Sequence, residues 1–138
     1  MAWKRVDGLR TIEFGTVGSS RSTILNFLFN GEKRATAGLL KQDYEDEGES
    51  VEQPGEVLVV LGNEFEEVGR IRTTRAEICN FADVPDEFAL AEAEGDLSGD
   101  DFRASHRDYW SPQGIEIKDG TKVVLMYFEV VESRFHQS

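Results

Sequence analysis

Two short apolar runs rich in β-branched residues place the strongest constraint on the fold of this chain. Val57–Leu61 reads VLVVL and is followed by Gly62-Asn63, and Val123–Phe128 reads VVLMYF near the end of the sequence. β-Branched and aromatic side chains favour strands, and runs without polar interruption favour strands that are buried. The sequence therefore predicts a buried strand at the first run and a central strand, from about Lys122 to Glu132, at the second.

Three other segments have the apolar spacing of helices. The first runs from about Ser20 to Asn30, with neighbouring serines available as N-caps and Gly31 at the position of a C′ glycine. A second begins near Pro85, which belongs in a first helical turn, and stops at Gly95. A third follows from Ser98, where Ser98 and Asp101 have the spacing of a capping box.

Strands and helices alternate here without a regular βαβ rhythm. Ala35 to Leu40 can run extended, and Val68 to Ile78 is expected to pair in a hairpin with Val57–Leu61. This mixture predicts the α+β class, with a curved or closed sheet flanked by helices. The 138 residues, 39% of them hydrophobic, suffice for one domain with its own core, so we expect a single domain over residues 1–138.

The charge of the chain restricts its partners. It has 27 acidic against 15 basic residues, a formal net charge of −12. Because proteins bind duplex nucleic acid mostly through Lys and Arg contacts to phosphate, we expect no duplex DNA partner. The sequence contains no apolar run near the ~18–20 residues of a membrane span and no apolar leader, so we expect a cytoplasmic protein without a membrane partner.

No spacing typical of a metal or nucleotide cofactor appears. Cys79 is the single cysteine, and two histidines, His106 and His136, make no CxxC or HxxxH pattern, so we expect no metal site. Gly15–Ser20 precedes the first helix, where free backbone N–H groups can bind an anion, but it lacks the GK[ST] of a P-loop. An ordinary glycine turn with serine capping is the favoured explanation, and we expect no cofactor.

The acidic segment Asp43–Glu49 and a few single residues each allow two interpretations. Mutual repulsion predicts that Asp43–Glu49 is an exposed, mobile loop. Lys33 either complements the dipole of the first helix or converges with Thr36 on a site, which needs a bend because residues three apart on a strand face opposite ways. His106 is either a half-buried member of the third helix's apolar stripe or a base. Glu94, at the end of an acidic helix, is either solvated or a site residue.

Gly31-Glu32-Lys33-Arg34-Ala35-Thr36 resembles the GxKxxT signature of the ASCH domain family in the PUA-like superfamily. Further segments agree in order along the chain, and the similarity covers about residues 11–132: they are Glu13–Thr16, Pro54–Glu56, Thr73-Thr74, Phe88–Asp96 and Phe102–His106. The resemblance implies a PUA-like β-barrel with flanking helices and a cleft that accepts RNA or a nucleoside.

Some members of that family are amidohydrolases that act on acetylated cytidine with a Lys and a Thr from GxKxxT and a later Glu. Carried over by motif position, these are Lys33, Thr36 and Glu94, and the resemblance implies a ribonucleoside or short single-stranded RNA as partner. Other members have been assigned single-strand ribonuclease activity, and many have no known activity. A ribonuclease and a non-catalytic RNA-binding module are therefore the alternatives.

Further residues are expected to contact such a ligand: Gly31, Arg34, Arg72, Arg103 and His106. A threonine hydroxyl becomes an effective nucleophile only when a neighbouring base takes its proton. Lys33 serves either as that base or as a cation that stabilises an oxyanion while Glu94 handles the proton. The acidic Asp43–Glu49 segment favours a nucleoside over an extended RNA.

Overall fold

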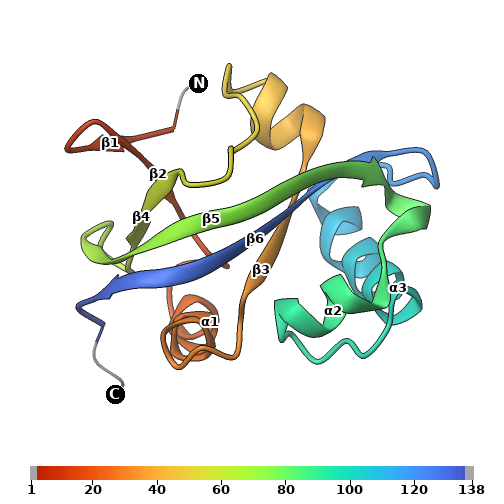
Figure 1. Cartoon of the computed structure of the whole chain (residues 1–138). Helices are drawn as coiled ribbons and strands as arrows, with labels where there is room; N and C mark the ends of the chain where they lie inside the picture. Colours follow the sequence, from red (N-terminus) through yellow and green to blue (C-terminus); the bar gives the residue numbers. More distant parts are fainter. Residues whose placement is uncertain (1–2, 136–138) are drawn as a thin grey trace.

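A computed structural model describes residues 3–135, whose strands form one mixed sheet in the order β1-β2-β4-β5-β6-β3 (Figure 1). The strands are β1 (Arg5–Val6), β2 (Leu9–Ile12), β3 (Ala35–Leu39), β4 (Val57–Leu61), β5 (Glu67–Asn80) and β6 (Lys122–Ser133). β2 and β4 run parallel, and every other neighbouring pair is antiparallel. Register shifts between β5 and β6 mark bulges, which increase the twist of these two long strands.

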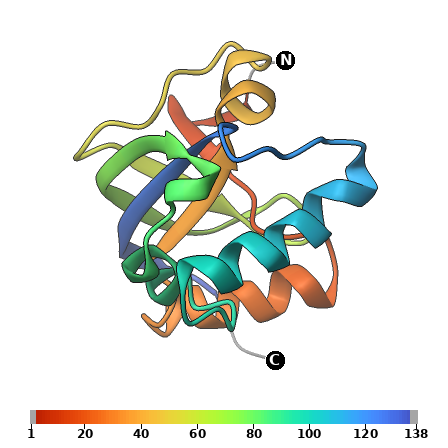
Figure 2. The same ribbon diagram turned by 90° about the vertical axis from the view of Figure 1, so that its right-hand side faces the viewer.

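Three helices and three shorter helical turns complete the described chain. The helices are α1 (Ser19–Phe29), α2 (Asp86–Glu92) and α3 (Gly99–Trp110), and the turns are Leu40–Glu45, Phe81–Asp83 and Ser111–Gln113. In Figure 1, β3 descends between α1 and the α2–α3 pair, and in Figure 2 α3 lies in front of the sheet. None of the helices in the described part of the chain has the length and apolar character of a membrane span.

β6 organises the hydrophobic core because both of its faces are covered. Val123, Leu125 and Tyr127 pack with side chains of α2 and α3, whereas Met126 and Phe128 pack with side chains of α1. Alternate residues of a strand point to opposite faces, so an uninterrupted apolar run requires a layer on each side. The prediction of a buried strand inside the sheet at this run is confirmed.

The α+β class and most predicted elements are confirmed, with small corrections at their ends. β4 matches the predicted strand at both ends, and β5 pairs with it as an antiparallel hairpin partner. The N-cap of α1 is Gly18 and not one of the predicted serines, so no side-chain hydrogen bond caps this helix. The predicted cap of α3 is confirmed, because the Ser98 hydroxyl accepts a hydrogen bond from the Asp101 N–H. β1 and β3 lie at the two ends of the strand order, so the sheet of residues 3–135 is open, not a closed barrel.

The prediction that Asp43–Glu49 is an exposed loop is confirmed only in part: Asp43, Glu45, Asp46 and Gly48 are exposed, but Tyr44 and Glu49 are buried. Leu40–Glu45 is helical, the Tyr44 side chain is buried and donates to Glu52, and Glu49 is 8% exposed. Glu49 is buried because cations from the N-terminal strands offset its charge: Arg5 contacts Glu49 at 2.9 Å and Arg10 contacts it at 3.6 Å. Paired carboxylates can be buried where isolated ones cannot.

Glu49 should make folding sensitive to acid. Hydrogen bonds from the Arg5 guanidinium lower the pKa of the Glu49 carboxyl from 4.5 to about 2. A carboxyl with a lower pKa in the folded state stabilises the protein above its unfolded-state pKa, and this contribution is lost as the pH falls towards the folded-state value. We therefore expect Glu49→Gln to flatten the decline in unfolding free energy between pH 4.5 and about 2, measured by urea unfolding.

A matched control uses Glu116, whose side chain is 81% exposed. Glu116→Gln should retain the acid dependence of the wild type. If Glu49→Gln and the wild type lose stability in parallel over this pH range, the Arg5 contact does not couple proton binding to folding.

Candidate ligand-binding and catalytic site

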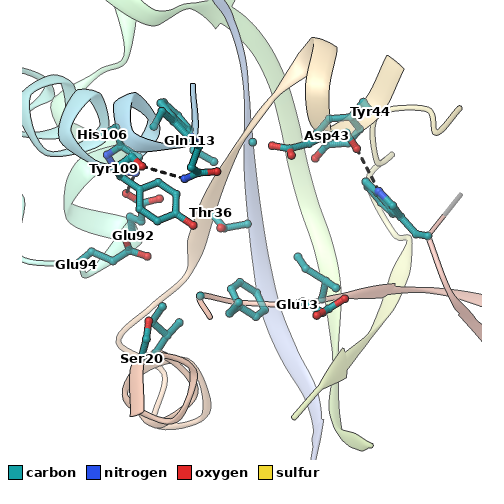
Figure 3. Close-up of a pocket in the computed structure, with 18 of the residues that line it drawn as sticks. Glu13, Ser20, Thr36, Asp43, Tyr44, Glu92, Glu94, His106, Tyr109 and Gln113 are labelled. Carbon is teal, nitrogen blue, oxygen red and sulfur yellow. Dashed lines mark hydrogen bonds and ion pairs between the residues drawn. The ribbon is translucent and has the colours of Figure 1, made fainter. Parts of the chain in front are cut away.

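An acidic cavity of about 690 Å³ lies between β3, the start of α1 and the ends of α2 and α3 (Figure 3). Seven of its lining residues carry carboxylates: Glu13, Asp43, Glu47, Glu52, Glu92, Glu94 and Asp96. Lys4 is the one lysine or arginine among the lining residues of the described chain. Trp3, Tyr44, Tyr109 and Trp110 add aromatic surface, so the cavity combines negative charge with flat apolar walls.

The end of α2 brings two glutamates to this cavity. Glu92 is the last residue of α2, and Ala93 follows in the left-handed conformation with φ 55° and ψ 40°. This reversal turns the chain so that Glu94 reaches the buried side chain of Lys33. The Arg34 N–H donates to Ala91 O at 2.7 Å, which joins the last turn of α2 to the segment that leads into β3.

Lys33 is enclosed by protein groups and does not line the cavity. Its side chain is 1% exposed, and Nζ donates to Glu92 O at 3.0 Å and to Glu94 Oε2 at 2.8 Å. Nζ also lies 5.9 Å from the centroid of the Phe14 ring, a cation–π contact. The enclosed Lys33 ammonium is joined to the cavity wall through Glu94, whose side chain is 33% exposed.

Glu92 is the most deeply buried acid of the cavity wall. Its carboxylate accepts the Ala37 N–H, yet Oε1 has no hydrogen-bond partner among the described residues. Burial, opposed in part by the Lys33 charge, raises the pKa of the Glu92 carboxyl from 4.5 to about 8. The nearest cation-forming group to Oε1 is His106, whose Nε2 lies 3.6 Å away.

His106 fits both interpretations of its sequence position. Its ring stacks on Phe102 with centroids 3.8 Å apart, as a member of the helix stripe would, and it also lines the cavity. Nδ1 lies 3.0 Å from the Phe102 carbonyl oxygen. Burial lowers the pKa of the His106 imidazole.

Thr36, the second residue of β3, faces the cavity, as Figure 3 shows, whereas Ala35 is buried in the cluster formed with α2 and α3. Lys33 precedes β3, so the strand alternation that separates residues three apart does not govern it. Within residues 3–135 no hydrogen bond joins Lys33 to Thr36. Thr36 and Glu94 both line the cavity, and Glu94 in turn contacts Lys33.

The other expected ligand contacts lie outside the cavity lining. Gly31 follows α1 at φ 90°, and Arg34 is exposed. Arg72 pairs with Glu129 at 2.8 Å, and Arg103 donates to the carbonyls of Ala82 and Val84. Of this group, His106 alone lines the cavity.

Sequence reasoning did not single out Glu92 as a site residue. A usable signal existed, because Glu92 lies four residues after the buried Phe88 and so shares its helix face. The acids from distant segments, such as Glu13 and Glu52, carried no comparable signal. Their convergence depends on the pairing of β2 with β4 and on the packing of the Leu40–Glu45 turn.

The open mixed sheet with its flanking helices is that of a PUA-like α+β domain. The chain belongs to the ASCH domain family, whose model matches residues 10–132. That family is associated with RNA binding. The resemblance found in the sequence is thereby confirmed.

Solved structures show the same fold. An ASCH domain from Lactobacillus crispatus superposes with a TM-score of 0.71 and 27% identity, covering 90% of this chain and 82% of that one. A protein from Enterococcus faecalis assigned to the DUF984 family superposes with a TM-score of 0.74 and 23% identity, covering 90% of this chain and 77% of that one. A hypothetical protein named PH0355 superposes with a TM-score of 0.56 and 14% identity, covering 87% of this chain and all of that one. A comparison with curated proteins finds no match.

Proposed function

We propose that this ASCH domain binds a ribonucleoside in the acidic cavity and hydrolyses an acyl amide on its base, as in N4-acetylcytidine. The observation that carries the proposal is the cavity itself, which has Thr36 and Glu94 in its wall. Its volume of about 690 Å³ lies within the range of roughly 300–1,000 Å³ that small-molecule sites occupy. Its aromatic side chains supply faces on which a base stacks.

The distribution of charge favours a nucleoside over an RNA chain. Phosphate binding requires free Lys and Arg side chains along a track. Most of the basic residues here are instead spread over different elements and paired with acids, as in Arg70 with Glu67, Lys41 with Asp46 and Arg107 with Asp119. The single-strand ribonuclease and the non-catalytic RNA-binding module therefore have less support than the nucleoside site.

The proposed reaction is acyl transfer through Thr36. Its Oγ1 bonds to the acyl carbon while the Glu94 carboxylate accepts the hydroxyl proton. The bond from that carbon to N4 then breaks, and N4 takes the proton from Glu94 and leaves as the amino group of cytidine. Water hydrolyses the Thr36 ester and releases acetate. Lys33 is a positioning residue in this scheme, because its contact at 2.8 Å holds one oxygen of Glu94.

Ligand binding tests the cavity separately from catalysis. We expect N4-acetylcytidine to bind more tightly than its 5′-monophosphate by about tenfold or more, because the carboxylates that line the cavity repel the added phosphate. Isothermal titration calorimetry with the Thr36→Val variant measures both affinities without turnover. Asp96→Asn removes one charge of the lining and should reduce this preference, whereas Asp100→Asn, at a side chain that is 93% exposed, should preserve it.

Two results would contradict the proposal. Tighter binding of the monophosphate or of a short RNA, weakening with added salt, would favour the RNA-binding alternatives. Absence of binding by any cytidine derivative would remove the nucleoside site altogether.

A further inference from the structure

We propose that Glu92, Glu94 and His106 bind a divalent transition-metal ion in the wall of the cavity. One ligand atom from each residue lies within 4.8 Å of the other two. The residues come from the end of α2, the turn after it and the middle of α3, which explains why no local sequence spacing indicates the site. The proposal concerns the ion alone and holds whether or not a nucleoside binds.

The hydrogen bonds of His106 leave Nε2 with a lone pair for a metal. A carbonyl oxygen only accepts hydrogen bonds, so the 3.0 Å contact with Phe102 O requires the proton on Nδ1. The Ser105 hydroxyl also lies 3.2 Å from Nδ1, but it donates its proton to Asp96 at 2.8 Å, so at Nδ1 its oxygen is an acceptor. Backbone carbonyls hold the Nδ1–H of metal-binding histidines in the same way.

Glu92 supplies an independent observation. It is 2% exposed, and its Oε1 has no hydrogen-bond partner among the described residues. This oxygen faces the Nε2 of His106 at 3.6 Å, so two electron-pair donors oppose each other in a buried place. Leaving a buried carboxylate oxygen unpaired is unfavourable, and a cation between the two atoms removes that cost.

The spacing fits coordination bonds. Zinc binds His nitrogen and carboxylate oxygen at about 2.0–2.2 Å, so two such ligands in a tetrahedral arrangement lie roughly 3.4 Å apart. The separation of 3.6 Å between Nε2 and Oε1 is close to this value. Glu94 supplies the third ligand, since one of its carboxylate oxygens lies within 4.8 Å of the ligand atoms of the other two residues.

Local charge favours an ion with two positive charges. When a bound ion displaces the proton of Glu92, the carboxylates of Glu92, Glu94 and Asp96 carry three negative charges and Lys33 one positive charge, which leaves −2 beside His106. One imidazole with carboxylates suits zinc, cobalt and manganese, whereas magnesium prefers an all-oxygen shell. With three protein ligands, the ion would keep a coordination position open towards the cavity.

Direct metal titration tests the site. Protein dialysed against EDTA and then against metal-free buffer should bind one Zn²⁺ per chain by calorimetry, and Co²⁺ should produce the visible absorption bands of a low-symmetry site. Glu92→Gln, Glu94→Gln and His106→Asn should each weaken Zn²⁺ binding by about a hundredfold or more. Circular dichroism establishes that each variant is folded, and Glu94→Gln alters the most exposed of the three side chains.

Two control variants separate this site from non-specific binding. His136→Asn changes the other histidine of the chain, and Glu87→Gln changes a glutamate of α2 whose side chain is 70% exposed. Both should bind Zn²⁺ as the wild type does. No saturable Zn²⁺ binding by wild type would show that a proton alone lies between Glu92 and His106, and undiminished binding by the folded His106→Asn variant would place the ion elsewhere. Either result overturns the proposal, and neither bears on nucleoside affinity.

Discussion

Replacement of Thr36 by valine should lower kcat/KM for release of cytidine from N4-acetylcytidine by roughly a thousandfold or more, the effect expected when a nucleophile is removed. Valine keeps the β-branched shape that suits β3 and removes only the hydroxyl. The expected loss is in chemistry and not in folding, because the Thr36 hydroxyl makes no hydrogen bond with protein groups of residues 3–135 that the substitution would break. Chromatography of cytidine and its acetyl form measures the rate.

Thr36→Ser and Thr74→Val are the matched variants for this prediction. Serine restores a hydroxyl at the same place and should recover a measurable part of the activity. Thr74 lies on β5 with its side chain exposed, and it does not line the cavity, so Thr74→Val should turn over substrate as the wild type does. Full activity in Thr36→Val would exclude Thr36 as nucleophile and favour direct attack by water. Similar losses in Thr36→Val and Thr74→Val would indicate a general effect on the sheet.

The interior strands of the sheet were predictable from the sequence because an uninterrupted apolar run must be buried on both faces. β4 and β6 carry apolar residues at consecutive positions, and such runs are stable only where both faces are covered. The short strands β1 and β2 were not predicted, since their polar residues, such as Arg10 and Thr11, are buried only through long-range partners. Arg10 binds Glu56 and the Ser50 carbonyl, and these contacts cannot be predicted from the residues near Arg10 in the sequence.

Part of the candidate site was predictable in the same sense. The resemblance singled out Lys33, Thr36 and Glu94, and the structure places Glu94 against Lys33. Burial was not predictable, because the sequence does not show that the Lys33 ammonium is enclosed or that Glu92, two positions before Glu94, is the deeper acid. Burial of a charge depends on which partners the whole fold brings to it. That dependence decides which substitutions report on chemistry and which report on stability.

Replacement of Lys33 by methionine should destabilise the fold by about 2–4 kcal/mol, and lower the midpoint of thermal unfolding by on the order of 10 °C. Methionine preserves most of the buried volume, so the cost arises from the lost charge. Glu92 O and Glu94 Oε2 both lose a donor, at 3.0 Å and 2.8 Å. The expected loss of stability is smaller than for a fully enclosed ion pair, because one third of the Glu94 side chain is exposed to solvent.

Lys41 provides a control with the same chemistry at the surface. Its Nζ lies 2.8 Å from Asp46, the same separation as in the Lys33–Glu94 pair, but the two side chains are 69% and 49% exposed. Lys41→Met should therefore cost less than about 1 kcal/mol. Because the penalty at Lys33 comes largely from a carboxylate left without its partner, Lys33→Met/Glu94→Gln should be more stable than the sum of the two single variants implies. Equal costs for Lys33→Met and Lys41→Met, measured by urea unfolding at neutral pH, would show that enclosure adds nothing to this ion pair.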